Sequence, residues 1–400
     1  MSDDDATPAG RSRRRFLAAA GVAGIAGLAG CNAFGDGDGT QRSDGGDQGG
    51  GTETAGGSDG GSAGQIGSGR SPFGDRQVSG GVSMTEMPDL SGELTLYSGR
   101  GEALVGELIA FIEDLYPDLT VRPRYNSAAD LVNQLLTEGD ASPADVFFSV
   151  NAGSLGALAD EGLTRELPSE VLEMVPDAFH DPDGQWVGTS GRARTIPYNT
   201  NAYAESEIPD DIMAFPETEA FADDVGWAPT YSSFQAFVTA MRVLEGEEAT
   251  RQWLTGMQDL GVSEYSDEFL VSQAVADGEV SVGFANHYYI QRVLAGRPNA
   301  PIATAFTSGD AGAIFNVAGA AALDTAEDPD LAANFVRHLL SAEAQDYFAR
   351  TTFEYPLVPG VDPIGRLPPI DELNPPEELD LTQLSDLEGT ISLMRDVGVL

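Results

Sequence analysis

The chain has 400 residues, and its 64 acidic and 21 basic residues give a formal net charge of −43. So negative a chain repels phosphate groups, which excludes nucleic acid as an expected partner and excludes electrostatic attachment to anionic lipid. The 41% of hydrophobic residues favours a folded protein kept soluble by surface carboxylates, and the acid-rich, lysine-free composition resembles that of halophilic archaeal proteins.

The first 31 residues are typical of an export signal. The arginines of SRRRFL precede the small, apolar run AAAGVAGIAGLAG, which resembles a twin-arginine (Tat) signal and is too short and too rich in Gly and Ala for a transmembrane span. The run ends in LAGC, which resembles a lipoprotein cleavage box, so we expect lipidation of Cys31. The alternative is an uncleaved leader with a chance cysteine. Because Cys31 is the only cysteine, intramolecular disulfides and thiolate metal clusters are excluded.

Residues 32–92 are rich in Gly, Ser, Asp and Gln and poor in large apolar residues. Such a segment buries too little surface to offset its chain entropy. We therefore expect 32–92 to be a disordered, flexible tether, with ordered structure from Glu93 onward.

From Glu93 onward, expected strands alternate with expected helices. In chain order these are the strand LTLYS, a helix with Leu104, Leu108, Phe111, Ile112 and Leu115 on one face, the strand LTVRPRY, a helix around DLVNQLL, the strand ADVFFSV and the helix SLGALADEG. This alternation predicts an α/β fold with a parallel sheet and right-handed crossovers.

The second half of the chain continues in the same style. It holds the helices SFQAFVTAMRVL and EEATRQWLTGMQDL, the strand VSVGFA and the helix DLAANFVRHLLSAEAQDYFA. The ordered region of about 300 residues exceeds what one hydrophobic core comfortably holds, so we expect two domains.

The order of these segments resembles that of ferric-iron-binding proteins, the substrate-binding components of iron ABC importers. The matching motifs are LTLYSGRGE, SPADVFFS, SGRARTIPYNT, APTYSSFQAF, SQAVADGEVSVGFANHYY and EYPLVPG. They occur in the same order, and the resemblance covers essentially the whole of 93–400. The resemblance implies a two-lobed periplasmic-binding-protein fold of type II, with the ligand in a cleft between lobes joined by two crossing strands near 192–196 and 313–317. Lobe 1 would comprise 93–190 plus 318–365, and lobe 2 would comprise 191–317 plus 366–400.

The same resemblance implies a set of iron ligands. Tyr288 and Tyr289 fall on the tyrosine pair that supplies two phenolates to Fe³⁺, and Tyr231 falls on a third tyrosine found in many members. Arg192, in the first crossing segment, falls on an arginine that holds a synergistic anion such as carbonate, and Arg100 falls on a second arginine found in some members.

The chain also departs from some members of the family. Gly101 stands where they have a histidine, and Val150 stands where others have a glutamate. The resemblance therefore implies the variant that binds iron through tyrosines and an anion, while the role of Glu102, beside Gly101, stays open.

The chemistry of Fe³⁺ agrees with such a ligand set. Fe³⁺ is a small, hard cation that prefers oxygen donors, and it can displace the proton of a phenol whose ordinary pKa is about 10. Arginines would balance the surplus negative charge, and the backbone N–H groups of Ser232 and Ser233, at the start of a helix, would also meet an anion. Asn286 would either bond the anion or cap the following helix.

Local geometry allows the tyrosine pair to act together. Adjacent side chains on a strand point to opposite faces, but on a first helical turn they diverge by only about 100°. We expect His287 to face elsewhere, Tyr198 to pack in the core, and only one of Arg192 and Arg194 to face the cleft. For a tyrosine pair taken alone, the plainer interpretation is one buried ring and one surface ring.

We therefore expect a monomeric lipoprotein on the extracellular face of the cytoplasmic membrane. It would capture Fe³⁺ with an anion and deliver it to the permease and ATPase of an ABC importer. One alternative is the same fold binding an organic or inorganic anion without metal. A secreted enzyme is disfavoured, since no nucleophile elbow, HExxH motif, phosphate-binding loop or dinucleotide fingerprint is visible.

Overall fold

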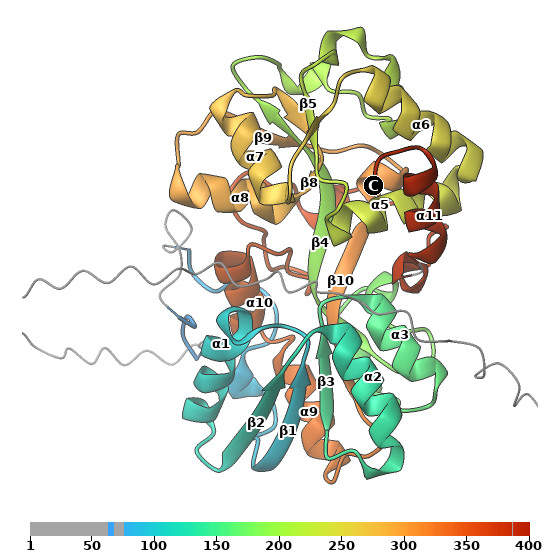
Figure 1. Cartoon of the computed structure of the whole chain (residues 1–400). Coiled ribbons are helices and arrows are strands. Elements are labelled where there is room, and N and C mark those ends of the chain that lie inside the picture. Colours follow the sequence, from blue (N-terminus) through green and yellow to red (C-terminus); the bar gives the residue numbers. More distant parts are fainter. Residues whose placement is uncertain (1–62, 68–75, 386) are drawn as a thin grey trace, which may run out of the picture. The chain divides into compact units, whose positions relative to one another are not determined.

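The computed structural model describes residues 63–67, 76–385 and 387–400, all within one compact unit that spans Ser58–Leu400. The expected signal, Cys31 and most of the expected tether lie outside the described residues. Within this unit, helices cover the two ends of a mixed sheet, and the strands β4 and β10 run from one lobe into the other (Figure 1).

Lobe 1 is built on three parallel strands and the helices that flank them (Figure 1). The strands are β1 (Gly92–Ser98), β2 (Leu119–Tyr125) and β3 (Val146–Ser149). The helices are α1 (Glu102–Leu115), α2 (Ala128–Glu138), α3 (Ala152–Asp160), α4 (Ser169–Leu172), α9 (Pro329–His338) and α10 (Ala342–Tyr347), with a π-helical turn, η8, at Phe348–Thr352. Their apolar faces meet in one continuous core.

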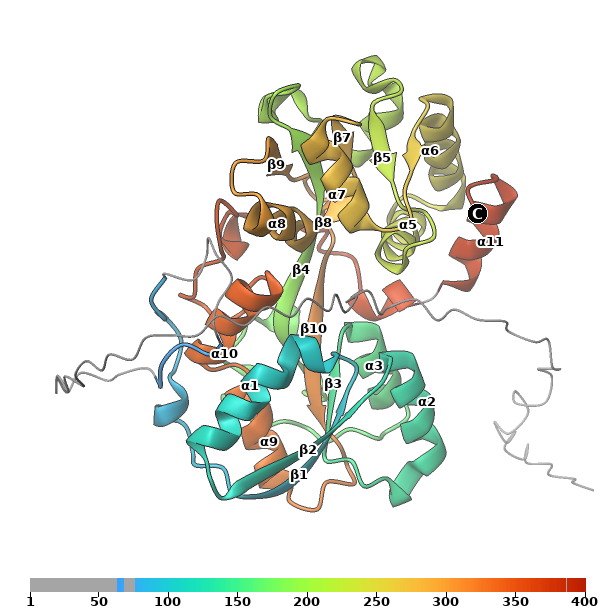
Figure 2. The same ribbon diagram turned by 60° about the vertical axis from the view of Figure 1, so that its left-hand side comes forward.

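In the described part of the chain, lobe 2 contains strands that are mostly shorter than those of lobe 1, together with five helices (Figure 2). The strands are β5 (Val225–Trp227), β6 (Ser263–Glu264), β7 (Val282–Gly283), β8 (Ala285–Asn286) and β9 (Ile302–Ala305). The helices are α5 (Ser232–Leu244), α6 (Glu247–Asp259), α7 (Glu268–Asp277), α8 (His287–Gly296) and α11 (Glu388–Asp396). Phe284, just before β8, is buried against Phe237 and Trp253, which fixes the chain immediately ahead of α8.

Short 3₁₀ turns complete the secondary structure. They are η1 (Met84–Glu86), η2 (Gly139–Ala141), η3 (Asp177–Phe179), η4 (Glu205–Glu207), η5 (Ile212–Glu217), η6 (Glu219–Phe221), η7 (Ala311–Ala313), η9 (Ile370–Glu372) and η10 (Leu381–Ser385).

Two strands cross between the lobes where the sequence places them. β4 (Val187–Asn199) pairs with β10 (Phe315–Ala322) in antiparallel register, with Phe315 opposite Ala193 and Val317 opposite Gly191. In lobe 1, β10 lies beside β3, and in lobe 2, β4 lies beside β7, β8 and β9. The expected two-lobed α/β fold is confirmed, although the sheet is mixed rather than parallel because β10 and β4 run against their neighbours.

The end of the expected tether is ordered, contrary to prediction. Met84 and Leu90 are buried in the core of lobe 1. The buried carboxylate of Glu343 on α10 accepts hydrogen bonds from the Ser83 hydroxyl, at 2.7 Å, and from the Met84 backbone N–H, at 2.9 Å. Composition alone suggested disorder, but a few well-spaced apolar side chains and a buried carboxylate hold 76–92 on lobe 1.

The last long helix is also different from expectation. The stretch predicted as one helix breaks after α9, and α10 starts anew at Ala342. The Ser341 hydroxyl caps the new helix by accepting the Ala344 backbone N–H at 3.2 Å. On the new helix, Glu343 and Asp346 contact the segment that precedes β1.

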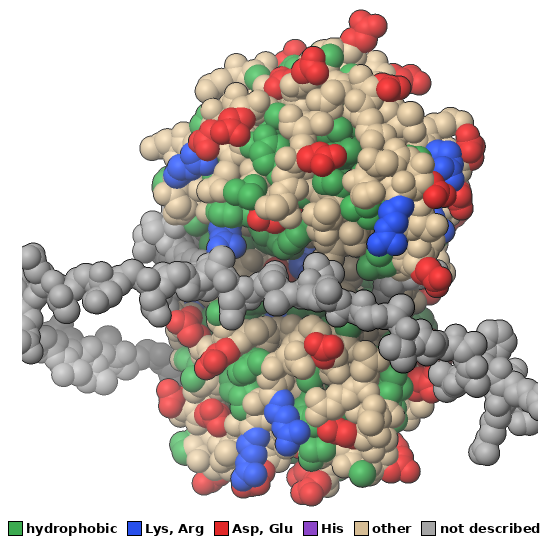
Figure 3. Space-filling model, viewed as in Figure 1, with side chains coloured by type: hydrophobic (Ala, Val, Ile, Leu, Met, Phe, Trp, Pro, Cys, Tyr) green, Lys and Arg blue, Asp and Glu red, His purple; other side chains and the backbone are tan. Residues whose placement is uncertain are grey.

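The visible surface of both lobes carries many Asp and Glu side chains and few arginines (Figure 3). Among the described helices, none has the length and apolar character needed to cross a membrane.

Candidate metal and anion site

Tyr288 and Tyr289 lie on the first turn of α8, as their proposed role requires. β8 ends at Asn286, whose backbone is extended (φ −72°, ψ 143°), and the helix begins at His287. Strand alternation therefore ends before the pair, and the two phenol rings lie with centroids only 4.4 Å apart. The Asn286 side-chain amide donates a hydrogen bond to the Tyr288 hydroxyl at 3.1 Å, so this hydroxyl is oriented by its own helix start.

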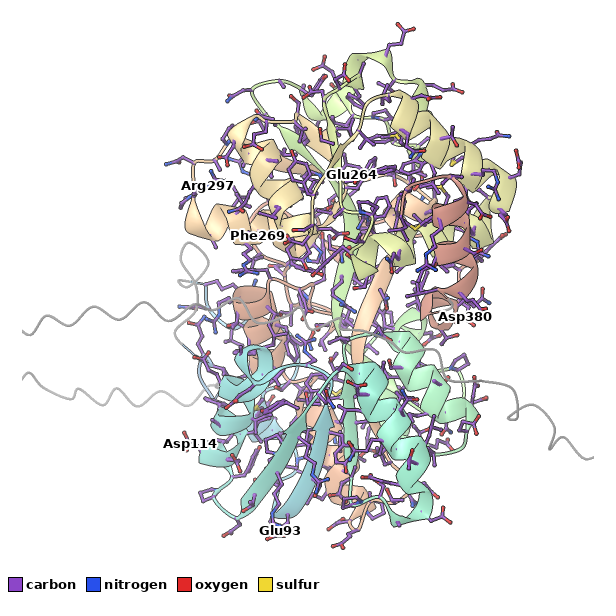
Figure 4. All side chains as sticks on the ribbon, viewed as in Figure 1. Glu93, Asp114, Glu264, Phe269, Arg297 and Asp380 are labelled. Atoms are coloured by element: carbon purple, nitrogen blue, oxygen red, sulfur yellow. The ribbon has the colours of Figure 1, made fainter. Side chains whose placement is uncertain are left out.

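Tyr231 reaches the same place from a different helix. It is the N-cap residue of α5, and its hydroxyl shares a hydrogen bond with the Tyr289 hydroxyl. The two rings meet edge to face with centroids 6.1 Å apart. The three tyrosines named from the sequence are thus brought together by two helix starts of lobe 2. Phe269 of α7, labelled in Figure 4, lies next to this cluster, with its ring centroid 6.4 Å from that of Tyr289.

Tyr289 is buried and Tyr288 is half-buried, and a raised pKa keeps these two phenols protonated in the absence of a cation. Burial raises the pKa of Tyr289, and the nearby Tyr288, Tyr231 and Glu268 raise it further. Burial also raises the pKa of Tyr288, while Arg192 acts in the opposite direction. A bound trivalent cation would reverse this balance, because it stabilises the phenolate form directly.

A buried ion pair in lobe 2 contacts the residue that precedes α8. Glu268, at the first position of α7, is fully buried, pairs with Arg194 of β4 and accepts the Asn286 backbone N–H at 3.0 Å. The guanidinium of Arg194 also lies over the rings of Phe234 and Phe237. Arg194 is therefore committed to lobe 2 packing, which leaves Arg192 as the arginine of β4 that faces the tyrosines.

Arg100 has a protein partner that sequence reasoning missed. Its side chain is 1% exposed, and it donates to Glu354 at 2.6 Å and to the Ser190 hydroxyl at 2.9 Å. Phe148 and Phe348 flank its guanidinium. The predicted contact of Arg100 with an external anion stays a prediction, and the structure adds that a carboxylate of the chain itself pairs with this guanidinium.

Arg192 lies near the ion pair of Arg100 and Glu354 but forms no salt bridge with Glu354. Gly191 and Tyr355 exchange backbone hydrogen bonds at 2.8 Å in an antiparallel bridge, which sets Arg192 across from Glu354. Arg192 is half-buried, and its Nε has no hydrogen-bond partner among the described residues. Its charge acts on both Tyr288 and Glu354. Unlike Arg100 and Arg194, Arg192 therefore has no ion-pair partner among the described residues.

The remaining sequence-named residues fall into two groups. Ser233 sits at the start of α5 with a buried hydroxyl that lacks a partner among the described residues, whereas the neighbouring Ser232 is exposed. Asn286 makes no side-chain cap, which removes that alternative. Tyr198 packs in the lobe 2 core, as expected. Glu102 is exposed at the start of α1.

His287 is buried and turned toward β4 and Tyr355. Its Nδ1 accepts the Ala193 backbone N–H at 3.1 Å. Burial lowers its pKa to about 4, so the imidazole is neutral at neutral pH. As expected, the ring faces away from the tyrosine hydroxyls, and its Nδ1 contacts the backbone of β4.

Glu354 and Glu268 are the site residues that sequence reasoning did not identify. Glu354 belongs to the motif EYPLVPG, which matched the family without suggesting a role for its carboxylate. Glu268 is the first residue of the helix EFLVSQAVAD. An acidic residue in the first turn commonly stabilises a helix through its dipole, so the sequence indicated no further role. Among the described residues, no group of three or more His, Cys, Asp or Glu side chains is disposed to hold a metal ion.

The chain has two α/β lobes, and its candidate ligand side chains lie beside the strands that cross between them. These features are typical of the class of proteins that bind a solute between two lobes. The chain belongs to the family of bacterial extracellular solute-binding proteins, whose family model matches residues 107–371. The expectation of a binding protein rather than an enzyme is thereby confirmed.

Known proteins similar to this chain point to one solute. The major ferric iron-binding protein of Neisseria meningitidis is 29% identical over 80% of this chain and 96% of that protein. The crystal structure of iron-bound HitA from Pseudomonas aeruginosa matches with 31% identity and a TM-score of 0.66, covering 78% of this chain and all of that one. A Trichodesmium protein solved with iron and citrate matches with 25% identity and a TM-score of 0.66, covering 77% of this chain and 99% of that one. The resemblance to ferric-iron-binding proteins is confirmed.

Proposed function

We propose that this protein captures Fe³⁺ outside the cell, with Tyr231, Tyr288 and Tyr289 as phenolate ligands. The single observation that carries the proposal is the convergence of these three hydroxyl groups from two helix starts, with Tyr231 and Tyr289 in direct hydrogen-bond contact. Relatives named as ferric iron-binding proteins support the choice of metal. Three phenolates would neutralise the charge of one Fe³⁺ ion, and hard oxygen donors match its preference.

A small anion would complete the coordination of the metal. Arg192, with an unpartnered Nε, is the residue we propose to hold it, and Ser233 at the start of α5 offers a hydroxyl and backbone N–H groups. Asn286, whose amide already contacts the Tyr288 hydroxyl, would orient the same region, and Ser232 would contribute from the helix start. An oxyanion of the carbonate and bicarbonate type, in either protonation state, matches the chemistry of these donors.

Delivery would use the two-lobed fold. Binding of iron to lobe 2 would favour the arrangement of the lobes that also contacts lobe 1, since differential affinity is what shifts such an equilibrium. The permease and ATPase of an iron ABC importer would receive the ion. A lipid at Cys31, after export through the Tat signal, would keep the receptor on the outer face of the membrane, and we propose that it acts as a monomer.

The test is a titration of the purified, metal-free protein with Fe³⁺ in the presence of bicarbonate. We expect a visible phenolate-to-iron charge-transfer band that saturates at one iron per chain. Tyr288→Phe and Tyr289→Phe should each remove most of the band and weaken binding. Unchanged colour and affinity in both variants would overturn the ligand assignment, and calorimetry showing anion binding without metal would favour the anion-binding alternative.

A further inference from the structure

Three arginines lie near the crossing strands, and two of them already hold a buried carboxylate. Arg100 pairs with Glu354 at 2.6 Å, and their side chains are 1% and 10% exposed. Arg194 pairs with Glu268, and their side chains are 1% and 0% exposed. Each pair is close to neutral as a unit, so neither adds a positive charge to the site.

Glu354 is held in place by more than its ion pair. Its Oε2 accepts hydrogen bonds from Arg100 at 2.6 Å, from the Thr352 hydroxyl at 2.8 Å and from the Ser190 hydroxyl at 2.9 Å. Burial alone would raise the pKa of this carboxyl, but Arg100, Arg192 and the Thr352 hydroxyl more than offset that effect and lower it. Glu354 is therefore a fixed negative charge of the protein, built into the place where an external anion would otherwise meet Arg100.

Arg192 remains as the guanidinium whose charge is not cancelled by its own partner. It lies two positions after Ser190 on β4, on the same face of the strand, and across the bridge from Glu354. No ion pair joins it to a described residue. Arg100, Arg192 and Glu354 together carry one net positive charge.

The charges of the loaded site can then be counted. Three phenolates balance one Fe³⁺, and Arg194 with Glu268 adds nothing. The group of Arg100, Arg192 and Glu354 leaves one positive charge, which one negative charge on the anion would neutralise. A dianion would leave an excess negative charge in a shielded site, inside a chain whose net charge is already −43.

We propose that Glu354 sets the charge of the anion that accompanies iron, so that the site takes a singly charged oxyanion of the bicarbonate or carboxylate class in preference to dianions and citrate. This inference rests on the proposed function and deepens it by naming the anion class and the residue that selects it. Glu354 acts here as a specificity-determining residue that contacts Arg100, and it is not assigned as an iron ligand.

The experiment compares acetate with malonate as the only added anion in bicarbonate-free buffer. Apparent Fe³⁺ affinity is read from the charge-transfer band in wild-type protein and in Glu354→Gln. Chelation of iron by free anion is the same for both proteins and cancels when their malonate-to-acetate ratios are compared. We expect Glu354→Gln to raise this ratio by about tenfold or more, because removing one fixed negative charge near the anion favours a dianion.

Two variants control the interpretation. Glu93→Gln removes an equal charge from an exposed position at the far end of lobe 1 (Figure 4) and should leave the ratio unchanged. The double variant Arg100→Gln with Glu354→Gln restores the original charge count and should return the ratio toward the wild-type value. A ratio in Glu354→Gln equal to that of wild type, or a double variant as shifted as the single one, would overturn the inference.

A second measurement uses the wild-type chain and does not depend on how the variants fold. Infrared difference spectra of the iron-loaded protein with ¹³C-labelled bicarbonate should show the bands of a protonated, singly charged anion. Bands of carbonate would overturn the inference while leaving iron binding intact. Failure of any anion to produce the charge-transfer band would instead overturn the proposed function itself, so the two failures are distinguishable.

Discussion

The hydroxyl groups of Tyr231 and Tyr289 share a hydrogen bond although 58 positions separate them along the chain. The contact joins the start of α5 to the first turn of α8 and places two phenol oxygens side by side. A phenol that donates to its neighbour is already oriented for a shared ion, so a cation that displaces the proton finds both oxygens in place. Little rearrangement within lobe 2 is then needed to bind iron.

Replacing Tyr231 tests whether it belongs to the metal site. Tyr231→Phe removes the hydroxyl that contacts Tyr289 and keeps the ring. We expect Fe³⁺ affinity to fall by more than about a hundredfold, since even residues behind the first ligands change metal affinity by ~10–100-fold. The charge-transfer band should also move, because one phenolate is lost. Tyr203→Phe, which removes a hydroxyl bonded to the Ala220 carbonyl elsewhere in lobe 2, is the matched control and should bind like wild type.

Breaking the ion pair behind α8 should destabilise lobe 2. Glu268→Gln leaves Arg194 buried without a countercharge, and both side chains are at most 1% exposed. Breaking such a pair costs about 3–5 kcal/mol, which urea unfolding of the metal-free protein would measure.

The same lobe offers an exposed pair for comparison. Glu247→Gln breaks the contact of Glu247 with Arg251, whose side chains are 62% and 33% exposed, and should cost less than about 1 kcal/mol. Equal losses in the two variants would contradict the structural role given to Glu268.

The segment before β1 should contribute to the stability of lobe 1. A chain shortened to begin at Gly92 loses the buried side chains of Ile66, Met84 and Leu90. Each buried side chain of this size is worth ~1.5–3 kcal/mol before the cost of ordering the chain, so we expect a net loss of about 2–5 kcal/mol in unfolding free energy. A chain shortened to begin at Ala63 should match the full-length protein, and equal stability of both shortened chains would show that the segment adds nothing.

His338 should make the protein less stable in mild acid. Burial and Arg337 lower its pKa below the ordinary 6.5, although the Asn334 carbonyl, Glu343 and Asp89 act in the opposite direction. Above pH 6.5 the imidazole is neutral in both the folded and the unfolded chain. As the pH falls below that value the unfolded chain takes up a proton that the folded chain resists, so the unfolding free energy decreases.

The measurement is urea unfolding between pH 7 and pH 5 for wild type and for His338→Gln. The glutamine cannot titrate, yet its amide can still meet the Tyr116 hydroxyl, which lies 3.0 Å from the His338 ring. The variant should therefore show a shallower loss of stability with falling pH. An identical pH slope in both proteins would assign the acid sensitivity to other groups.

The three tyrosines were predicted from the motifs shared with ferric-iron-binding proteins, and a local signal showed that the pair could act together. The strand VSVGFA ends directly before the pair, so a helical turn was the geometry that lets both rings meet one ion, and the structure places the helix start at His287. Tyr231 was named from the family motif alone, and the structure places it directly before α5. Motif order in the family supplied the link between the two.

The contacts of Glu354 could not be predicted in this way. Its partner Arg100 lies 254 positions away, and no periodicity or spacing connects an isolated carboxylate to a guanidinium at that separation. The ordered segment before β1 did leave a signal, since Met84, Met87 and Leu90 recur at three-residue intervals, but the surrounding Gly and Ser residues outweighed it in composition. The break before α10 was likewise marked by Ser341, a residue that caps helices.

The contacts of the segment before β1 with lobe 1 also determine which lobe bears a force applied to the N-terminal part of the chain. Arg76 forms a salt bridge with Asp346 at 2.7 Å, and Arg350 donates a hydrogen bond to the Ile66 carbonyl at 2.9 Å. Both contacts lie in lobe 1. Tension on the chain ahead of Ala63 is therefore taken up by lobe 1. Lobe 2, which carries the three tyrosines, is joined to that support through β4 and β10, so such tension does not act on the tyrosine cluster directly.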